Sequence, residues 1–234
     1  MNLILLFEDD FAADDIVRLT GRRLEHVMNV HRVKVGDELT VGVSGGRIGS
    51  GVVTRLDDAL EMRVALKDDP PPPLPLTLVL ALPRPKVLNR VIASATSLGV
   101  KRMHLINAWR VEKSYWKSPK LSYENFLLQR TLGLEQAKDT ILPDISLHRL
   151  FRPFVEKELP SIAKDSLALV AHPRANDECP RAVEGAVTLA IGPEGGFIAE
   201  EIASLKRIGF QAVSLGARVL RVETAVAALI GRLY

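Results

Sequence analysis

The chain has 234 residues, is 47% hydrophobic and carries a formal net charge of +3 at pH 7, so it is long enough for one large domain or two smaller ones. It contains no apolar run of about 18 residues, and its N-terminus turns acidic too early for a secretory signal, which predicts a cytoplasmic protein. The single cysteine, Cys179, excludes an internal disulfide, and the five histidines lack the spacing of metal ligands, so we expect no metal.

The charge is divided unevenly along the chain. Residues 1–70 hold 9 Lys/Arg and 13 Asp/Glu, whereas residues 71–234 hold 22 and 15, which gives the two parts net charges of −4 and +7. A positive second part suits a polyanionic partner, although ordinary enzymes show the same asymmetry.

A proline-rich segment separates two different hydrophobic patterns. Residues 68–75 read DDPPPPLP, and four consecutive prolines enter neither a helix nor a central strand. Before this segment, residues 31–66 alternate short β-rich runs with turn signals, which is typical of a small antiparallel barrel. We therefore predict one domain over residues 1–70, mostly β, and a second over residues 71–234.

The second part alternates apolar strand-like runs with helical patterns. LTLVLAL (76–82) is a continuous apolar run, and KVLNRVIASATSLG places apolar residues on one helical face. Four further apolar runs follow, MHLI, LALVA, VTLAI and AVSL, together with helical patterns at 122–138, 198–208 and 223–233. Strands buried on both faces and separated by helices predict an α/β domain with a mainly parallel sheet.

The first candidate site is the turn in LAIGPEGGF, residues 189–197. Pro193 fixes φ, while Gly195 and Gly196 permit positive φ and lack the Cβ atoms that would keep a ligand away from the backbone. We expect free N–H groups near residues 196–199 at the carboxyl end of a strand, where open α/β sheets bind ligands. A strand-to-helix connection without a ligand has the same pattern, so this turn alone decides nothing.

The second candidate site repeats this arrangement in SLGARVLRVETAVAALI, residues 214–230. A strand ends near Leu215, and a glycine and a short loop with Arg218 and Arg221 precede an apolar helix. Two such turns at strand ends can face one pocket, where the arginines bind a polar or anionic partner and the apolar side chains contact an uncharged ring. Alternatively, both arginines are solvated surface charges.

IGPEGGF together with LGARVLRVETA resembles the RsmE family of SPOUT-class RNA methyltransferases, which methylate N3 of a uridine in small-subunit ribosomal RNA. The resemblance covers the whole chain, since HVMNVHRVKVGD is similar to the family's RNA-facing segment, LALPRPK to its domain entry and LEQAKDTILPDI to its central EQ segment. It implies a PUA-like barrel, a trefoil-knotted α/β domain, a homodimer and bound S-adenosylmethionine. By this resemblance the cofactor contacts are Ile191, Gly192, Gly196, Leu215, Gly216, Leu220 and Arg221.

Transfer of a methyl group to uridine N3 requires that nitrogen to lose its proton. A cation near the base oxygens stabilises the resulting anion, so Arg218 and Arg221 are candidate catalytic residues. Glu223, the third candidate, and Glu194 are possible proton acceptors. A helix N-terminal charge is the alternative role of Glu223, so the base stays unassigned.

Two basic clusters are candidate RNA contacts. Residues 101–120 hold six Lys/Arg and one acid and contain both tryptophans, a composition typical of single-stranded RNA surfaces. A second basic group lies in the acidic first domain. The predicted RNA-binding residues are Arg22, Arg23, Arg32, Lys34, Arg110 and Lys113. Alternatively, the aromatic residues belong to the core or to a dimer interface.

Two other functions fit the same residues. One is a catalytically silent RNA-binding protein on the same scaffold, and the other is a related methyltransferase with a different RNA target. Retention of both glycine turns argues against the silent protein, because RNA binding alone does not require them.

Overall fold

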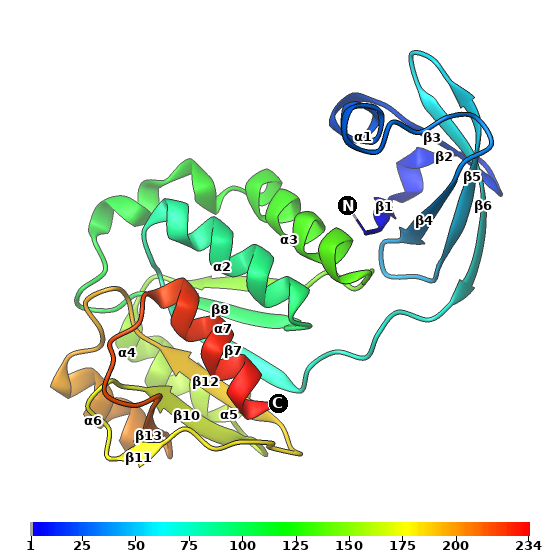
Figure 1. Ribbon diagram of the computed structural model, residues 1–234. Coiled ribbons are helices and arrows are strands. Elements are labelled where there is room, and N and C mark those ends of the chain that lie inside the picture. Colours follow the sequence, from blue (N-terminus) through cyan, green and yellow to red (C-terminus); the bar gives the residue numbers. More distant parts are fainter. Residues whose placement is uncertain (1) are drawn as a thin grey trace. The chain divides into compact units, whose positions relative to one another are not determined.

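The structure is a computed structural model that describes residues 2–234, and within them every side chain except those of His26, Val30 and His31. The chain forms two compact units (Figure 1). The first contains the chain up to Pro72 together with Thr131–Leu142, and the second contains Pro73–Arg130 and Pro143–Tyr234. The proline-rich segment therefore separates the units, but the linear boundary at residues 70 and 71 omits Thr131–Leu142 from the first unit.

Residues 131–142 belong to the first unit because hydrogen bonds join them to residues 2 and 3 and to Gly46. The carbonyl of Glu135 accepts hydrogen bonds from the amides of Asn2 and Leu3, at 3.2 and 3.0 Å. The Thr140 hydroxyl donates to the carbonyl of Gly46 at 2.6 Å. Such long-range pairing cannot be read from local periodicity, so a sequence-based boundary misses it.

The first unit is built on a curled six-stranded sheet in the order β1-β4-β5-β6-β3-β2 (Figure 1). Its elements are β1 (Ile4–Leu6), η1 (Glu8–Asp10), β2 (Phe11–Ala13), β3 (Ile16–Leu19), α1 (Gly21–His26), η2 (Val27–His31), β4 (Glu38–Val43), β5 (Ile48–Leu56) and β6 (Leu60–Asp68). The mostly β character is confirmed. The fully antiparallel arrangement is wrong, because β1 pairs with β4 in parallel.

The second unit is a seven-stranded parallel sheet in the order β11-β13-β10-β12-β7-β8-β9, which confirms the predicted parallel sheet. Its strands are β7 (Leu76–Ala81), β8 (Arg102–Ile106), β9 (Asp144–His148), β10 (Leu167–Ala171), β11 (Asp177–Glu178), β12 (Val187–Ile191) and β13 (Gln211–Ser214). Every residue of the central strands β7 and β12 is buried. Their continuous apolar runs reflect burial on both faces.

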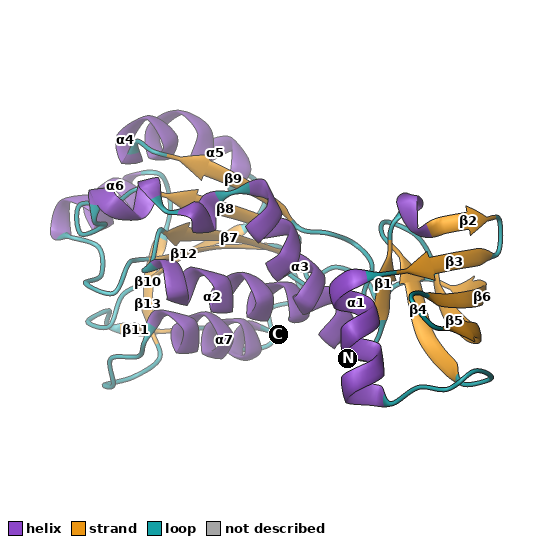
Figure 2. Ribbon diagram, turned by 90° about the horizontal axis from the view of Figure 1, so that it is seen from above, coloured by secondary structure: helices purple, strands orange, loops and turns teal. Residues whose placement is uncertain are grey.

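Helices cover both faces of this sheet. The pair α2 (Pro85–Ser97) and α7 (Val222–Leu233) packs on one face, and α4 (Phe151–Pro153), η5 (Phe154–Glu158), α5 (Leu159–Ile162) and α6 (Ala199–Arg207) lie on the other (Figure 2). The remaining helical segments are η3 (Lys113–Lys117), η4 (Pro119–Leu121) and α3 (Tyr123–Ala137). No helix among the described residues is both long and apolar enough to cross a membrane.

The four long helices α2, α3, α6 and α7 agree with the sequence patterns to within one or two residues. Pro85 opens α2, whose buried face carries Leu88, Val91, Ile92 and Ala95. The patterns missed β9 and the helical segments from Phe151 to Ile162. Strand β9 is half-exposed and mixes polar with apolar residues, and prolines interrupt the helical segments, so neither shows a clean period.

A polar cluster lies on β8 and the edge strand β9. The Ser146 hydroxyl is 2.7 Å from Nδ1 of His104 and 2.9 Å from Nε2 of His148. Nδ1 of His148 is 3.4 Å from a carboxylate oxygen of Glu158. Burial, with the nearby charges of His148 and Arg102, lowers the pKa of His104 to about 4, so its ring is neutral at pH 7.

This shift makes stability depend on pH in a definite direction. In the unfolded chain His104 has its ordinary pKa of 6.5, whereas in the folded protein its pKa is about 4. The contribution of His104 to folding stability is therefore fully present above pH 6.5 and is lost as the pH falls toward 4. Allowing for the partial exposure of the ring, we expect a contribution on the order of 1 kcal/mol. In urea unfolding at pH 7 and pH 4.5, His104→Asn should lose less stability than the wild type. Equal losses of stability in the variant and the wild type would contradict the lowered pKa of His104.

Candidate active site at the carboxyl edge of the parallel sheet

The two glycine turns lie at the same edge of the parallel sheet, the one formed by the carboxyl ends of its strands. Strand β12 ends at Ile191 and β13 ends at Ser214, and β10 lies between them, with Ala171 in register with both Ile191 and Val213. Since neighbouring strands are about 4.8 Å apart, the ends of β12 and β13 are separated by roughly 10 Å. The residues predicted to contact a cofactor follow these two ends: Ile191, Gly192 and Gly196 at β12, and Leu215, Gly216, Leu220 and Arg221 at β13.

The turn after β12 requires its glycines. A Cβ on Gly192 would lie 2.8 Å from the amide nitrogen of Phe197, so a side chain there would displace the backbone. Gly196 has φ of +71°, and a Cβ there would meet no atom within 4 Å. Its amide donates to the carbonyl of Pro193 at 2.7 Å. The turn is thus tightly folded on one side and open beside Gly196.

A buried glutamate joins this turn to the loop after β8. Glu201, 6% exposed, accepts the amide of Ile198 at 3.0 Å with one carboxylate oxygen and the amide of Trp109 at 2.7 Å with the other. The expectation of free N–H groups near residues 196–199 is therefore wrong for Gly196 and Ile198, because both amides have acceptors within the protein. Sequence reasoning missed Glu201, although a glutamate three residues after a helix N-cap position is the available signal.

Two further contacts hold the same turn. The carboxylate of Glu194 accepts the backbone amide of Arg84 at 3.0 Å, which ties the turn to the segment that follows β7. The Arg110 guanidinium donates to the carbonyl of Gly195. Glu194, considered as a proton acceptor, and Arg110, predicted to bind RNA, therefore both fix the turn.

The loop after β13 is open to solvent. Gly216 has φ of +106°, and residues 216–221 are all exposed. Arg218 and Arg221 have no ion pair among the described residues, so both charges are free to meet a ligand. Glu223, at the start of α7, lies 3.8 Å from Arg90 of α2, which makes it part of the contact between these helices.

The predicted RNA-binding residues of the first unit fall into two groups. Arg22, Arg32 and Lys34 are exposed. Arg23 is instead mostly buried and donates to the carboxylate of Asp10 at 2.6 Å, so its charge is already paired. Of these four residues, Arg22, Arg32 and Lys34 keep their charged groups exposed to solvent.

The basic and aromatic stretch at residues 101–120 also contains both exposed and buried side chains. Lys113 and Trp109 are exposed, the latter by 78%. Trp116 is buried, and its indole N–H donates to the side chain of Asn107 at 2.9 Å. Trp109 is therefore available for stacking on a base. Trp116 belongs to the core, which was the alternative interpretation of the aromatic residues in this stretch.

His172 follows β10, between the two glycine turns. Its amide donates to the carbonyl of Val213 at 2.9 Å, and its Nδ1 accepts the amide of Arg174 at 3.1 Å. Burial, with the charges of Arg174 and Lys206, lowers its pKa. The middle of this edge therefore carries a neutral imidazole. Among the described residues, no cluster of His, Cys, Asp and Glu is arranged to hold a metal ion.

Comparisons with known proteins agree on one family. The family model for the RNA methyltransferase domain matches residues 70–234. Ribosomal RNA small subunit methyltransferase E of Treponema pallidum is 30% identical over 233 residues, which cover 96% of this chain and 88% of that protein. The enzyme of the same name from Mycobacterium bovis is 27% identical over 88% of this chain and 81% of its own.

Solved structures share the fold of the whole chain. Ribosomal RNA small subunit methyltransferase E of Neisseria gonorrhoeae, bound to S-adenosyl methionine, superposes with a TM-score of 0.76 at 21% identity over 97% of this chain and 95% of that one. A Legionella pneumophila protein assigned to the methyltransferases, in complex with the cofactor SAM, gives 0.76 at 25% identity over 98% and 96%.

The bridge made by Glu201 can be tested without any ligand. In Glu201→Gln the side-chain carbonyl oxygen can still accept a hydrogen bond but the NH2 group cannot, so one of the two backbone amides loses its acceptor, at a cost of about 1 to 3 kcal/mol. The neighbouring Glu200 is exposed and its carboxylate bonds to nothing among the described residues, so Glu200→Gln is the matched control. Urea unfolding should show a lower midpoint for Glu201→Gln, and equal midpoints would refute the bridge.

Proposed function

Because the chain belongs to the ribosomal RNA small subunit methyltransferase E family, we propose that it methylates N3 of a uridine in 16S ribosomal RNA in the cytoplasm, with S-adenosylmethionine as methyl donor. The observation that carries the proposal is the edge of the parallel sheet at which the tight turn at residues 192–197 lies near the exposed arginine loop at residues 216–221.

The residues present fit such a cofactor. The absence of Cβ atoms keeps the backbone open beside Gly196, and Gly192 leaves room for the chain to fold back on itself. These residues, with Ile191, would contact the donor from β12. Leu215, Gly216, Leu220 and Arg221 would contact it from the loop after β13, where backbone groups can hydrogen-bond the adenine edge.

When bound, S-adenosylmethionine supplies an electrophilic methyl group carried on a sulfonium. The acceptor nitrogen of the uracil must lose its proton before or during the attack, which leaves negative charge on the neighbouring oxygens. Arg218 and Arg221, both unpaired among the described residues, would stabilise that charge.

The contact of Glu223 with Arg90 alters the balance between its two possible roles. A carboxylate in the first turn of α7, partly buried and close to an arginine of α2, is well suited to stabilising the helix end. We therefore favour a positioning role for Glu223 over that of proton acceptor.

RNA would contact both units through exposed cations. In the first unit these are Arg22, Arg32 and Lys34, and in the second unit Lys113, with Trp109 as a stacking platform. We further propose that the curled sheet is the PUA-like barrel of the family. The second unit would contain its trefoil knot and form the homodimer, to which the exposed Val219 can contribute apolar surface.

The decisive experiment combines donor binding with product analysis. Gly196 and Gly209 both have positive φ, and a Cβ at either would meet no atom within 4 Å, so alanine at each costs a similar ~1 to 2 kcal/mol of backbone strain. Only Gly196→Ala should weaken S-adenosylmethionine binding, by about tenfold or more, equivalent to ~1.4 kcal/mol. Calorimetric titration measures this difference.

Incubation of the wild type with unmethylated small-subunit RNA, followed by mass spectrometry, should then show one N3-methylated uridine. A chain that binds RNA but no donor would be the silent protein, and a methyl group elsewhere would assign a different target. Equal donor affinity of the Gly196→Ala and Gly209→Ala variants would contradict the location of the site.

Arg221 separates electrostatic catalysis from cofactor binding. If its guanidinium stabilises the anionic base, Arg221→Ala should lower kcat by about a hundredfold with little change in donor affinity. The reverse pattern would make Arg221 a cofactor clamp. Arg207, an exposed arginine on α6, provides the control variant Arg207→Ala, which should leave both quantities unchanged in the same methylation assay.

A further inference from the structure

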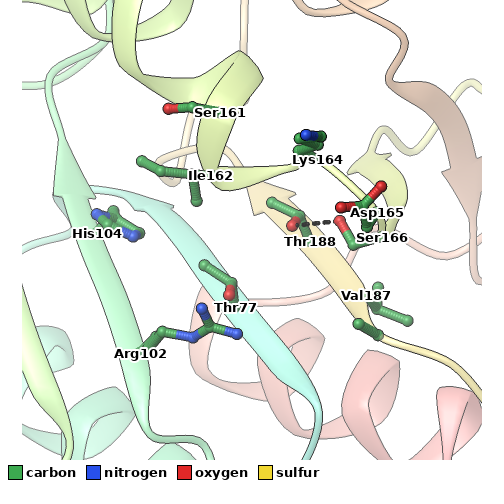
Figure 3. A pocket seen from close by; sticks show the side chains of 11 residues that line it. Thr77, Arg102, His104, Ser161, Ile162, Lys164, Asp165, Ser166, Val187 and Thr188 are labelled. Carbon is green, nitrogen blue, oxygen red and sulfur yellow. Dashed lines mark hydrogen bonds between the residues drawn. The ribbon is translucent and has the colours of Figure 1, made fainter.

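A polar cavity lies at the opposite edge of the same sheet, where its strands begin. It has a volume of about 390 Å³ and is lined by the amino ends of β7, β8 and β12 and by the segment from Ser161 to Ser166 (Figure 3). Strands of five residues rise about 16 Å, so this cavity, which we call the amino-edge pocket, is well separated from the glycine turns. The side chains that decide its chemistry are Thr77, Arg102, His104, Lys164, Ser166 and Thr188.

Thr77 is a buried residue whose side chain lines this cavity. It is 3% exposed, stands in a strand whose other residues are all apolar, and its hydroxyl makes no hydrogen bond to any described residue. Among the described residues, the one fully enclosed side-chain polar atom without a partner is Oγ1 of Thr96, so the Thr77 hydroxyl is reached from the cavity, where it can donate to a ligand.

Thr188 pairs with Thr77 in register on the neighbouring strand and is 1% exposed. The Ser166 hydroxyl donates to the carbonyl of Ala163 at 2.8 Å, so its one proton is used. Thr188 must therefore donate to Ser166, at 2.8 Å, and it keeps its own lone pairs. Of these hydroxyls, Thr77 alone has an uncommitted proton to donate to a ligand.

The pocket is positively charged. Arg102 and Lys164 line it, and neither has an ion pair within the described residues. Asp165 is the only carboxylate in the lining, and His104 is neutral at pH 7 with its Nδ1 bonded to Ser146, so the walls carry one net positive charge. Two cations without an ion pair, beside a hydroxyl that is open to the cavity, are a donor set for an anion.

We propose that the amino-edge pocket binds a phosphate group, carried by a small phosphorylated molecule or by the terminal nucleotide of an RNA. Phosphate offers several acceptor oxygens to Arg102, Lys164 and Thr77 together. The volume lies within the usual range for small-molecule sites, about 300 to 1,000 Å³, and exceeds what a bare phosphate requires. Because Thr77 is deeply buried, a terminal phosphate reaches it, whereas an internal phosphate of a duplex does not.

Titration calorimetry on the full chain tests this with four probes: inorganic phosphate, a nucleoside 5′-monophosphate, a 5′-phosphorylated trinucleotide and its 5′-hydroxyl counterpart. Arg102→Gln combined with Lys164→Gln should weaken phosphate binding by about tenfold or more. Both residues are exposed, so the double variant should fold. Thr77→Val, which keeps the side-chain shape, should weaken binding less. Lys157→Gln changes an exposed lysine of η5 outside the pocket and should leave the affinity unchanged.

The four probes also identify the source of the phosphate. Binding of inorganic phosphate or the monophosphate assigns a small phosphorylated ligand, and binding of the 5′-phosphorylated trinucleotide alone assigns an RNA end. No binding of any phosphorylated probe to the wild type, or equal weakening by Lys157→Gln and the double variant, overturns the proposal. Because S-adenosylmethionine affinity should be the same in all these variants, either result leaves the proposed methyl transfer standing.

Discussion

Burial of the parallel sheet on both faces is the constraint on which the second unit depends. With α2 and α7 on one face and α4 to α6 on the other, the central strands β7 and β12 have no solvent-facing side. Polar chemistry is therefore confined to the two edges where strands begin or end. The glycine turns stand at the carboxyl edge, and the amino-edge pocket opens where the same strands start.

At the carboxyl edge, two glutamate carboxylates hold the loops together by accepting hydrogen bonds from backbone amides. Glu201 accepts hydrogen bonds from the amides of Ile198 and Trp109, and Glu194 accepts one from Arg84, so hydrogen bonds join the segments that follow β7, β8 and β12. Among the described residues, no side-chain acceptor bonds to the loop after β13, and this loop carries exposed arginines. A hydrogen-bonded turn beside a solvent-exposed basic loop suits an enzyme that binds a small methyl donor and a large RNA substrate.

Charge is used in two ways along the chain. Arg23 and Arg110 bond to Asp10 and to the carbonyl of Gly195, and so contribute to local structure. Arg22 and Arg218 are exposed and remain available to a polyanion. Net charge alone does not distinguish these uses, because the distinction rests on which acceptor lies within reach of each guanidinium.

The amino-acid sequence by itself determined the parallel α/β character of the second unit, its long helices, and the two glycine turns with their family. Those features are local, because burial on both faces, helical periodicity and glycine φ preferences each depend on residues that are close together in the sequence. Only the tertiary structure decided that residues 131–142 join the first unit, that β1 pairs with β4 in parallel, that Glu201 accepts the Ile198 amide expected to be free, and that Thr77 lines a cavity. Each depends on contacts between segments far apart in the chain, for which no local pattern carries a signal.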